Sequence, residues 1–281
     1  MRLAALLLAA ASLLPAPAPA LAEPPTAEPP TADRATADPA VTLIGGWREA
    51  DGSRVAAIEI DLPPGWHTYW RVPGEAGVPP AFDWTGSTNL AAVRYEWPRP
   101  AMIESYGMRS FGYEDRLVLP VLLTPRDPAA PIDVALALSF GVCNDVCMAE
   151  TARIIARLSP DAAPEGRALI EAALAERARR PHEAGIARVI CTLEPAAGGY
   201  DLTAEVTFEV PPSGAQVAVF ESARPPLAGE AESRTDGRTL FARVPLAGAG
   251  DAGPMLERKG LRITVLDDRR AVDIRGCRAA G

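Results

Sequence analysis

The feature that most limits the fold of this sequence is a regular alternation of apolar and polar residues that recurs along the chain. From Leu202 to Val210 every second residue is apolar, and the residues between are glutamates and threonines. A second run of this kind extends from Ile132 to Phe140. A period of two is typical of strands with one buried face, because successive side chains point to opposite faces of a sheet. Many short runs separated by Pro and Gly turns predict an all-β chain built from β-sandwiches.

The same patterns divide the chain into segments. An isolated helical pattern from Pro164 to Arg180, with Leu169, Ile170 and Leu174 on one face, lies between two β-rich regions and is expected to connect them. Two identical repeats of Glu-Pro-Pro-Thr-Ala precede the first strand and contain nothing that could build a core. The expected order is a signal peptide, a Pro-rich disordered leader, a first sandwich, a helical connector and a second, smaller β-sandwich, over residues 1–22, 23–40, 41–160, 161–185 and 186–281.

The N-terminus has the three parts of an export signal. Met1 and Arg2 are followed by an apolar run from Leu3 to Leu14, and small residues end this region at Ala22. This order predicts cleavage after Ala22 and a periplasmic location. The run is too short to span a bilayer, so direct membrane insertion is not expected. With a formal net charge of −8 and no basic stripe, the chain is also not expected to bind nucleic acid.

Two of the four cysteines flank a predicted turn. The strand that ends near Phe140 leads to Cys143, and Asn144 and Asp145 supply turn residues before Cys147. A three-residue loop would place the two cysteines opposite each other, within reach of a disulfide. Closing so small a ring stabilises a protein by only about 2 kcal/mol. The spacing alone fits a redox-active pair and an inert hairpin disulfide about equally well.

The other two cysteines fit a structural role. Cys191 lies in the first strand of the second β region, and Cys277 lies just past its last strand. Four cysteines allow three pairings, and the sequence order favours Cys143 with Cys147 and Cys191 with Cys277. A bond across the second region closes a loop of roughly 85 residues, for which the chain-entropy relation gives about 4.5 kcal/mol.

Several separated motifs resemble one known family. They are Gly65 to Gly77, which begins Gly-Trp-His-Thr-Tyr-Trp-Arg, then Trp97 to Pro100, Tyr106-Gly107, Gly112-Tyr113, Leu119 to Val121, and the pair Cys143 and Cys147. Together they resemble the N-terminal domain of the thiol:disulfide interchange protein DsbD, and more closely the branch that includes the copper-sensitivity suppressor ScsB. The resemblance extends from Val41 to Leu158. It implies an immunoglobulin-like domain that passes electrons by thiol–disulfide exchange.

The resemblance also implies roles for single residues. Cys143 and Cys147 fall on the family's redox pair, and Tyr69 resembles an aromatic residue beside it. Tyr106 lies in a segment similar to the family's cap loop and is the expected shield over the cysteines. The sequence contains neither the membrane domain nor the thioredoxin-like domain of DsbD. The implied partners are therefore a separate membrane electron donor of DsbD or ScsB type and periplasmic thioredoxin-like proteins, with no cofactor.

Two other functions use the same residues. A Cu(I)-binding module could draw on soft sulfur ligands, namely Cys143, Cys147, Met102, Met108 and Met148. A redox-inert adaptor would use the sandwich only for docking. Asp145 would oppose ionisation of the thiols, and only His67 could assist from a distance, so the pair is expected to need a docked partner. On sequence alone, His67 is more simply a packed or surface residue, and Glu114 a solvated turn charge.

Overall fold

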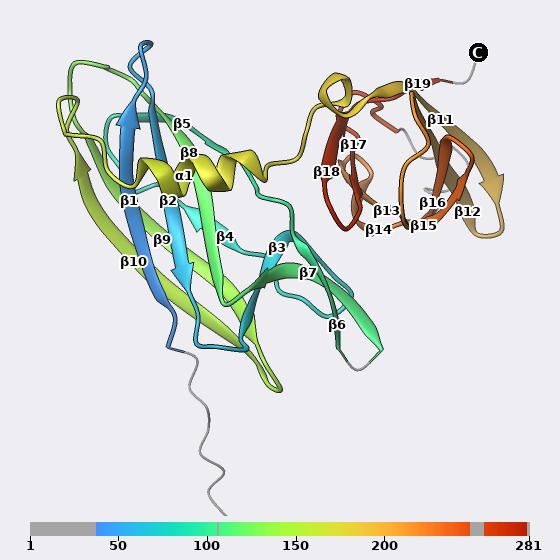
Figure 1. The fold of residues 1–281 in the computed structure, drawn as a ribbon, viewed down its shortest axis with the longest axis horizontal. Helices are drawn as coiled ribbons and strands as arrows, with labels where there is room; N and C mark the ends of the chain where they lie inside the picture. The colour runs from blue at the N-terminus through green and yellow to red at the C-terminus, as the bar shows by residue number, and fades with distance from the viewer. Residues whose placement is uncertain (1–37, 106, 248–255, 280–281) are drawn as a thin grey trace, which may run out of the picture. The chain divides into compact units, whose positions relative to one another are not determined.

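A computed structural model describes residues 38–105, 107–247 and 256–279 (Figure 1). Ala37–Gly281 forms one compact unit. The described residues fold almost entirely into antiparallel strands, with one α-helix and one short 3-10 helix. The predicted all-β fold class is therefore confirmed. The proposed signal peptide, nearly all of the Pro-rich leader, and Tyr106 lie outside the described residues.

The first sandwich consists of two sheets. One sheet has the order β1-β2-β8-β5 and contains β1 (Ala40–Arg48), β2 (Arg54–Asp61), β8 (Arg116–Pro125) and β5 (Leu90–Tyr95). The other has the order β10-β9-β3-β7-β6, with β4 paired to β9. It contains β10 (Cys147–Leu158), β9 (Ile132–Cys143), β3 (His67–Gly74), β7 (Met108–Glu114), β6 (Ala101–Ser105) and β4 (Ala81–Asp83).

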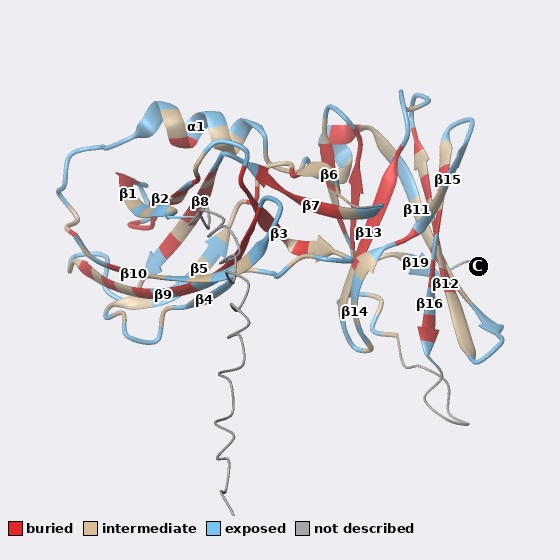
Figure 2. Ribbon diagram, turned by 90° about the horizontal axis from the view of Figure 1, so that it is seen from below, coloured by how far each residue is buried: buried red, intermediate tan, exposed pale blue. Residues whose placement is uncertain are grey.

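The core of this sandwich is formed by the alternate residues that the sequence pattern marks as apolar. Leu136, Leu138 and Phe140 of β9 are each at most 2% exposed, and the residues between them are more accessible. Trp70 of β3 packs edge-on against Phe111 of β7 within the same core. Figure 2 shows buried segments along β3, β7 and β9. Burial of each such side chain stabilises the fold by about 1.5–3 kcal/mol, and this fixes which face of β9 points inward.

The connector contains a shorter helix than the 3.6-residue pattern suggests. Helix α1 (Arg167–Ala175) begins after Gly166, which has a left-handed backbone, and buries Ile170 completely. The expected helical run to Arg180 is interrupted because the backbone of Arg177 forms an isolated β-bridge with Pro98. A 3-10 helix, η1 (Pro181–Ala184), follows.

The second sandwich also consists of two sheets. The first has the order β15-β16-β12-β11-β19, with β15 (Glu232–Asp236), β16 (Thr239–Ala247), β12 (Gly199–Phe208), β11 (Ile186–Ala196) and β19 (Arg278–Ala279). The second has the order β14-β13-β17-β18, with β14 (Pro226–Glu230), β13 (Val217–Ala223), β17 (Arg262–Leu266) and β18 (Ala271–Arg275). The last strand of this sandwich, β19, lies in the first of these sheets and pairs in parallel with β11.

Candidate functional site

The cysteine pair lies at the tip of the β9–β10 hairpin, the lower end of these two strands in Figure 1. Cys143 is the last residue of β9, Cys147 is the first of β10, and the two are paired in the strand register. A disulfide joins them, with 4.1 Å between their Cα atoms. The turn residues Asn144 to Val146 are exposed. Cys143 is 7% exposed, whereas Cys147 is exposed, so the two residues differ in their access to a partner.

The pair occupies the face of its sheet that points away from the sandwich core. Val142, next to Cys143, is fully buried within the core cluster. Successive strand residues point to opposite faces, so Cys143 points away from that core. Tyr69 of β3 is 2% exposed and likewise belongs to none of the core clusters. The site is thus a second buried region, separate from the apolar interior.

Strand register aligns four side chains across this face. Cys147 of β10 lies opposite Cys143 of β9, and Cys143 lies opposite His67 of β3. His67 in turn lies opposite Glu114 of β7. Directly opposed residues of an antiparallel pair project to the same face, with Cβ atoms about 4.5–5.5 Å apart. A disulfide, an imidazole and a carboxylate therefore form a continuous row across four strands.

Tyr69 contacts two members of this row, His67 and Cys147. It lies two residues after His67 on the same face, and the two rings meet edge-on with centroids 5.2 Å apart. Its hydroxyl lies 3.5 Å from Sγ of Cys147. Because a disulfide sulfur carries no hydrogen, the tyrosine O–H is the donor in this contact. Burial raises the pKa of Tyr69 above its usual value, so the hydroxyl keeps its proton at neutral pH.

Two glycines leave room for the Tyr69 ring. A methyl group at Gly141 of β9 would lie 2.9 Å from one edge of the ring and 2.8 Å from Cβ of Val78. A methyl group at Gly77 would lie 2.7 Å from the opposite edge of the ring. The ring is therefore held between β9 and the loop that follows β3. Any larger residue at either position must displace Tyr69 or the loop.

Gly141→Ala is expected to destabilise the first sandwich by about 1–3 kcal/mol, because the added methyl overpacks the Tyr69 ring. All five tryptophans lie between Trp47 and Trp97, so tryptophan fluorescence during urea unfolding reports this sandwich. Gly229→Ala is the matched control, since Gly229 is also a strand glycine but has open space around it. Equal unfolding midpoints for the two variants would show that Tyr69 is not held in this way.

Burial and a nearby carboxylate together determine the protonation state of His67. Burial lowers the pKa of its imidazole below the usual value, and the nearby Glu114 carboxylate opposes that shift without reversing it. His67 is 8% exposed, and Glu114 is exposed as expected for a turn charge. The ring is therefore mainly neutral at pH 7 and has one nitrogen free to accept a proton.

The methionines do not gather with the cysteine sulfurs. Met148 is paired with the core residue Val142, and both Met148 and Met102 pack against the apolar core. Met108 is 43% exposed at the turn between β6 and β7. Among the described residues, His, Cys, Asp and Glu form no group of three or more that could hold a metal ion. This arrangement does not favour a Cu(I) site built from all five sulfur ligands.

The remaining predicted site residues lie as follows. Cys191 of β11 and Cys277, between β18 and β19, are joined by a disulfide in the second sandwich. Tyr106 lies outside the described residues, between Ser105 of β6 and the turn at Gly107. The row with Glu114 and the glycines around Tyr69 were not found from the sequence, because they depend on which strands become neighbours.

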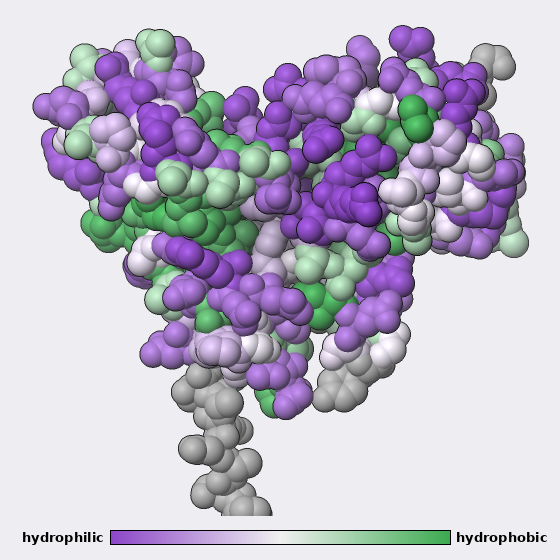
Figure 3. Space-filling model, viewed as in Figure 1, coloured by the Kyte–Doolittle hydropathy of each residue, from purple (hydrophilic) through white to green (hydrophobic). Residues whose placement is uncertain are grey.

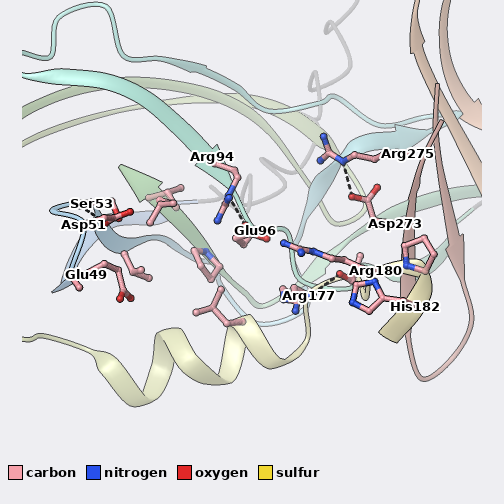
Figure 4. A pocket seen from close by; sticks show the side chains of 18 residues that line it. Glu49, Asp51, Ser53, Arg94, Glu96, Arg177, Arg180, His182, Asp273 and Arg275 are labelled. Carbon is pink, nitrogen blue, oxygen red and sulfur yellow. Dashed lines mark hydrogen bonds and ion pairs between the residues drawn. The ribbon is translucent and has the colours of Figure 1, made fainter. Parts of the chain in front are cut away.

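One large cavity in the described residues is formed by other parts of the chain than the cysteine site. It has a volume of about 990 Å³ and is lined by the β1–β2 turn, β5, β8, α1, η1 and β18. Figure 4 shows that its charged residues point toward one another, as in the Arg94–Glu96 and Arg275–Asp273 pairs. None of the four cysteines lines it, so this cavity holds no reactive sulfur. On the face of the molecule that Figure 3 shows, the surface is mainly polar, and apolar side chains gather beside α1, over β1 and β2.

Fold and site together define a β-sandwich domain that carries a disulfide at the tip of a hairpin. Residues 40–159 match the family model "Thiol:disulfide interchange protein DsbD, N-terminal", so this part of the chain is similar to that N-terminal domain. The recognition made from the sequence motifs is thereby confirmed.

A solved structure extends the likeness beyond the matched segment. The N-terminal periplasmic domain of ScsB from Proteus mirabilis is 24% identical, with a TM-score of 0.61, over 83% of this chain and 91% of that one. At this identity the likeness establishes a shared fold. No curated protein sequence matches the chain. Within the described residues, none of the helices has the length and apolar character needed to cross a membrane.

Proposed function

We propose that this protein is a periplasmic thiol–disulfide exchange module that relays electron pairs through Cys143 and Cys147. The observation that carries the proposal is the asymmetric disulfide at the hairpin tip, with one exposed and one buried cysteine, inside a domain similar to the N-terminal domain of DsbD. Exposure of one sulfur gives a partner thiolate a point of attack, and burial of the other limits random exchange.

Reduction of the pair proceeds in two displacements. A thiolate of a dithiol donor attacks Sγ of Cys147, the Cys143–Cys147 bond breaks, and Cys143 leaves as a thiolate that takes up a proton. The second donor thiolate then attacks its own partner sulfur in the mixed disulfide and releases Cys147. The donor is oxidised to a disulfide, and the pair gains two electrons and two protons. The same steps in reverse reduce a client disulfide.

The partners follow from the family and from the export signal. We take the donor to be a separate membrane protein of DsbD or ScsB type, and the clients to be periplasmic thioredoxin-like proteins. Residues 1–22 have the order of a secretory signal, and the structurally similar ScsB domain is described as periplasmic. Both observations support an exported protein.

The test is selective opening of one disulfide in the purified protein. At equilibrium with thiol buffers of increasing reducing strength, the Cys143–Cys147 bond should open while Cys191–Cys277 stays intact, because the bond that closes the longer loop stabilises the fold more. Alkylation followed by peptide mapping counts the free thiols at each position. A thioredoxin with both active-site thiols reduced should open the same bond.

The control is the Cys143→Ala/Cys147→Ala variant, which should consume no reductant under these conditions. If the Cys143–Cys147 bond neither opens nor re-forms over the accessible range of potentials, the exchange function is wrong. The domain would then act as a docking adaptor.

A further inference from the structure

Thiol–disulfide exchange by the two cysteines does not by itself account for the histidine and the carboxylate that lie beside them in the row. Building on the proposed function, we propose that His67 accepts the proton of the Cys143 thiol when Cys143 attacks the sulfur of Cys147 to release a reduced client. His67 would then be a proton acceptor specific to this resolving step, with Glu114 holding it from the far side.

Position is the first support. His67 is the direct cross-strand neighbour of Cys143, so their side chains leave the sheet side by side on the same face. Tyr69 contacts the His67 ring edge-on and limits its movement on one side. The turn at Gly65 also approaches the hairpin, since a methyl group there would lie 3.9 Å from the Asn144 amide. The imidazole is thereby held close to the buried sulfur.

Burial explains why Cys143 needs a proton acceptor. A thiol ionises with a pKa near 8.5 in water, and an apolar setting raises that value. Cys143 is 7% exposed and its neighbour His67 is 8% exposed, so water has limited access to either. Cys147 is exposed and can lose its proton to solvent. The two thiols therefore differ in how they can ionise.

The surrounding charges favour a neutral imidazole. Glu114 faces His67 from β7, Tyr69 faces it from its own strand as a neutral phenol, and Cys143 faces it from β9. Asp145 lies exposed in the hairpin turn, and the Asp115 carboxylate accepts a hydrogen bond from the Gly65 N–H. Burial nevertheless dominates and lowers the pKa of His67, which leaves a basic nitrogen at neutral pH. Glu114 then stabilises the imidazolium that forms on proton transfer.

The resolving step conserves protons and electrons. The Cys147 thiolate has attacked a client disulfide and is held in a mixed disulfide. His67 takes the proton of the Cys143 thiol, the Cys143 thiolate attacks Sγ of Cys147, and the bond from Cys147 to the client breaks. The pair is oxidised by two electrons, the client leaves as a thiolate, and His67 returns its proton through solvent to that thiolate.

The experiment follows the reaction of the reduced protein, its Cys191–Cys277 bond intact, with 5,5′-dithiobis(2-nitrobenzoate) in a stopped-flow instrument. Attack by Cys147 releases one coloured thiolate, and the attack by Cys143 on the mixed disulfide releases a second. His67→Gln and His67→Phe should slow the second phase by roughly 10- to 100-fold at pH 7, with little change in the first. His67→Phe keeps the ring against Tyr69 and removes both nitrogens.

The pH dependence separates this role from a structural one. In the wild type the second phase should slow as the pH falls through the pKa of His67, while the variants lack this inflection. Their deficit should shrink at high pH, where hydroxide ionises the thiol. His182→Gln, at an exposed histidine in η1, is the matched control and should behave as wild type. Tryptophan fluorescence verifies that each variant is folded.

Equal second-phase rates in wild type and both His67 variants would overturn the inference and leave the proposed function standing. Equal slowing of both phases would also overturn it, since the effect would then not belong to Cys143. If the wild type itself gives no second phase, the proposed exchange function fails independently of His67.

Discussion

Replacing Cys191 and Cys277 together with alanine is expected to lower the free energy of unfolding of the second sandwich by about 4.5 kcal/mol. The bond joins β11 to the segment before β19 and spans 86 residues of sequence. Removing it frees a large loop in the unfolded chain, and the entropy of that loop favours unfolding. A loss of this size is a large fraction of the stability of a typical domain.

The measurement must separate the two sandwiches. Far-UV circular dichroism during urea unfolding reports both, whereas tryptophan fluorescence reports the first sandwich alone. The double variant should shift the part of the circular dichroism transition that has no fluorescence counterpart. Cys143→Ala/Cys147→Ala is the matched control, and its short ring should cost about 2 kcal/mol in the fluorescence transition.

The opposite ranking would contradict this assignment of roles. If loss of the Cys143–Cys147 bond were the more damaging change, the hairpin disulfide would be the structural one. Peptide mapping that joined Cys191 to Cys143 or Cys147 would contradict the pairing itself.

The strands could be predicted from the sequence where one face is buried. The alternation from Ile132 to Phe140 and from Leu202 to Val210 required period-two structure, and β9 and β12 cover most of both runs. The hairpin at Asn144 and Asp145 could be predicted equally well, because its turn residues adjoin the two strands in sequence. Such features depend only on neighbours in sequence.

The details of the site depend on contacts between distant segments. No local pattern places His67 beside Cys143, because β3 and β9 are separated by more than 50 residues and their register follows from core packing. In the sequence Gly77 and Gly141 are ordinary loop and strand glycines, and only the fold places the Tyr69 ring between them. The helix that ends before Arg177 has the same origin, since a bridge to Pro98 competes with the helical pattern.

Mixed disulfides with partner proteins should form almost exclusively through Cys147. In Cys143→Ala the exposed Cys147 thiol remains and lacks its resolving partner, so a mixed disulfide persists once formed. In Cys147→Ala the remaining Cys143 is 7% exposed and stays beneath its neighbours. Access decides which sulfur exchanges, so the yield of trapped complexes should differ by at least about tenfold between the variants.

The assay uses each variant, reduced, with an oxidised thioredoxin-like protein, and separates the products on a non-reducing gel. A cytoplasmic thioredoxin and a periplasmic thioredoxin-like protein tested side by side distinguish general exchange from exchange with a preferred client. Alkylation of the same variants with iodoacetamide gives the access of each thiol without a partner. Cys147 should give both the higher yield of mixed disulfide and the faster alkylation.

The comparison of the two readouts identifies what limits the buried cysteine. If iodoacetamide reacts faster with Cys147 but partner proteins trap both cysteines equally, docking must open the hairpin, and both sulfurs would then serve as points of attack. If both readouts favour Cys143, the order of the two displacements is reversed and Cys147 becomes the resolving residue. A preference for Cys147 in both would make the static geometry of the hairpin tip, with Cys147 exposed and Cys143 buried beside His67, sufficient to set the order of the two displacements.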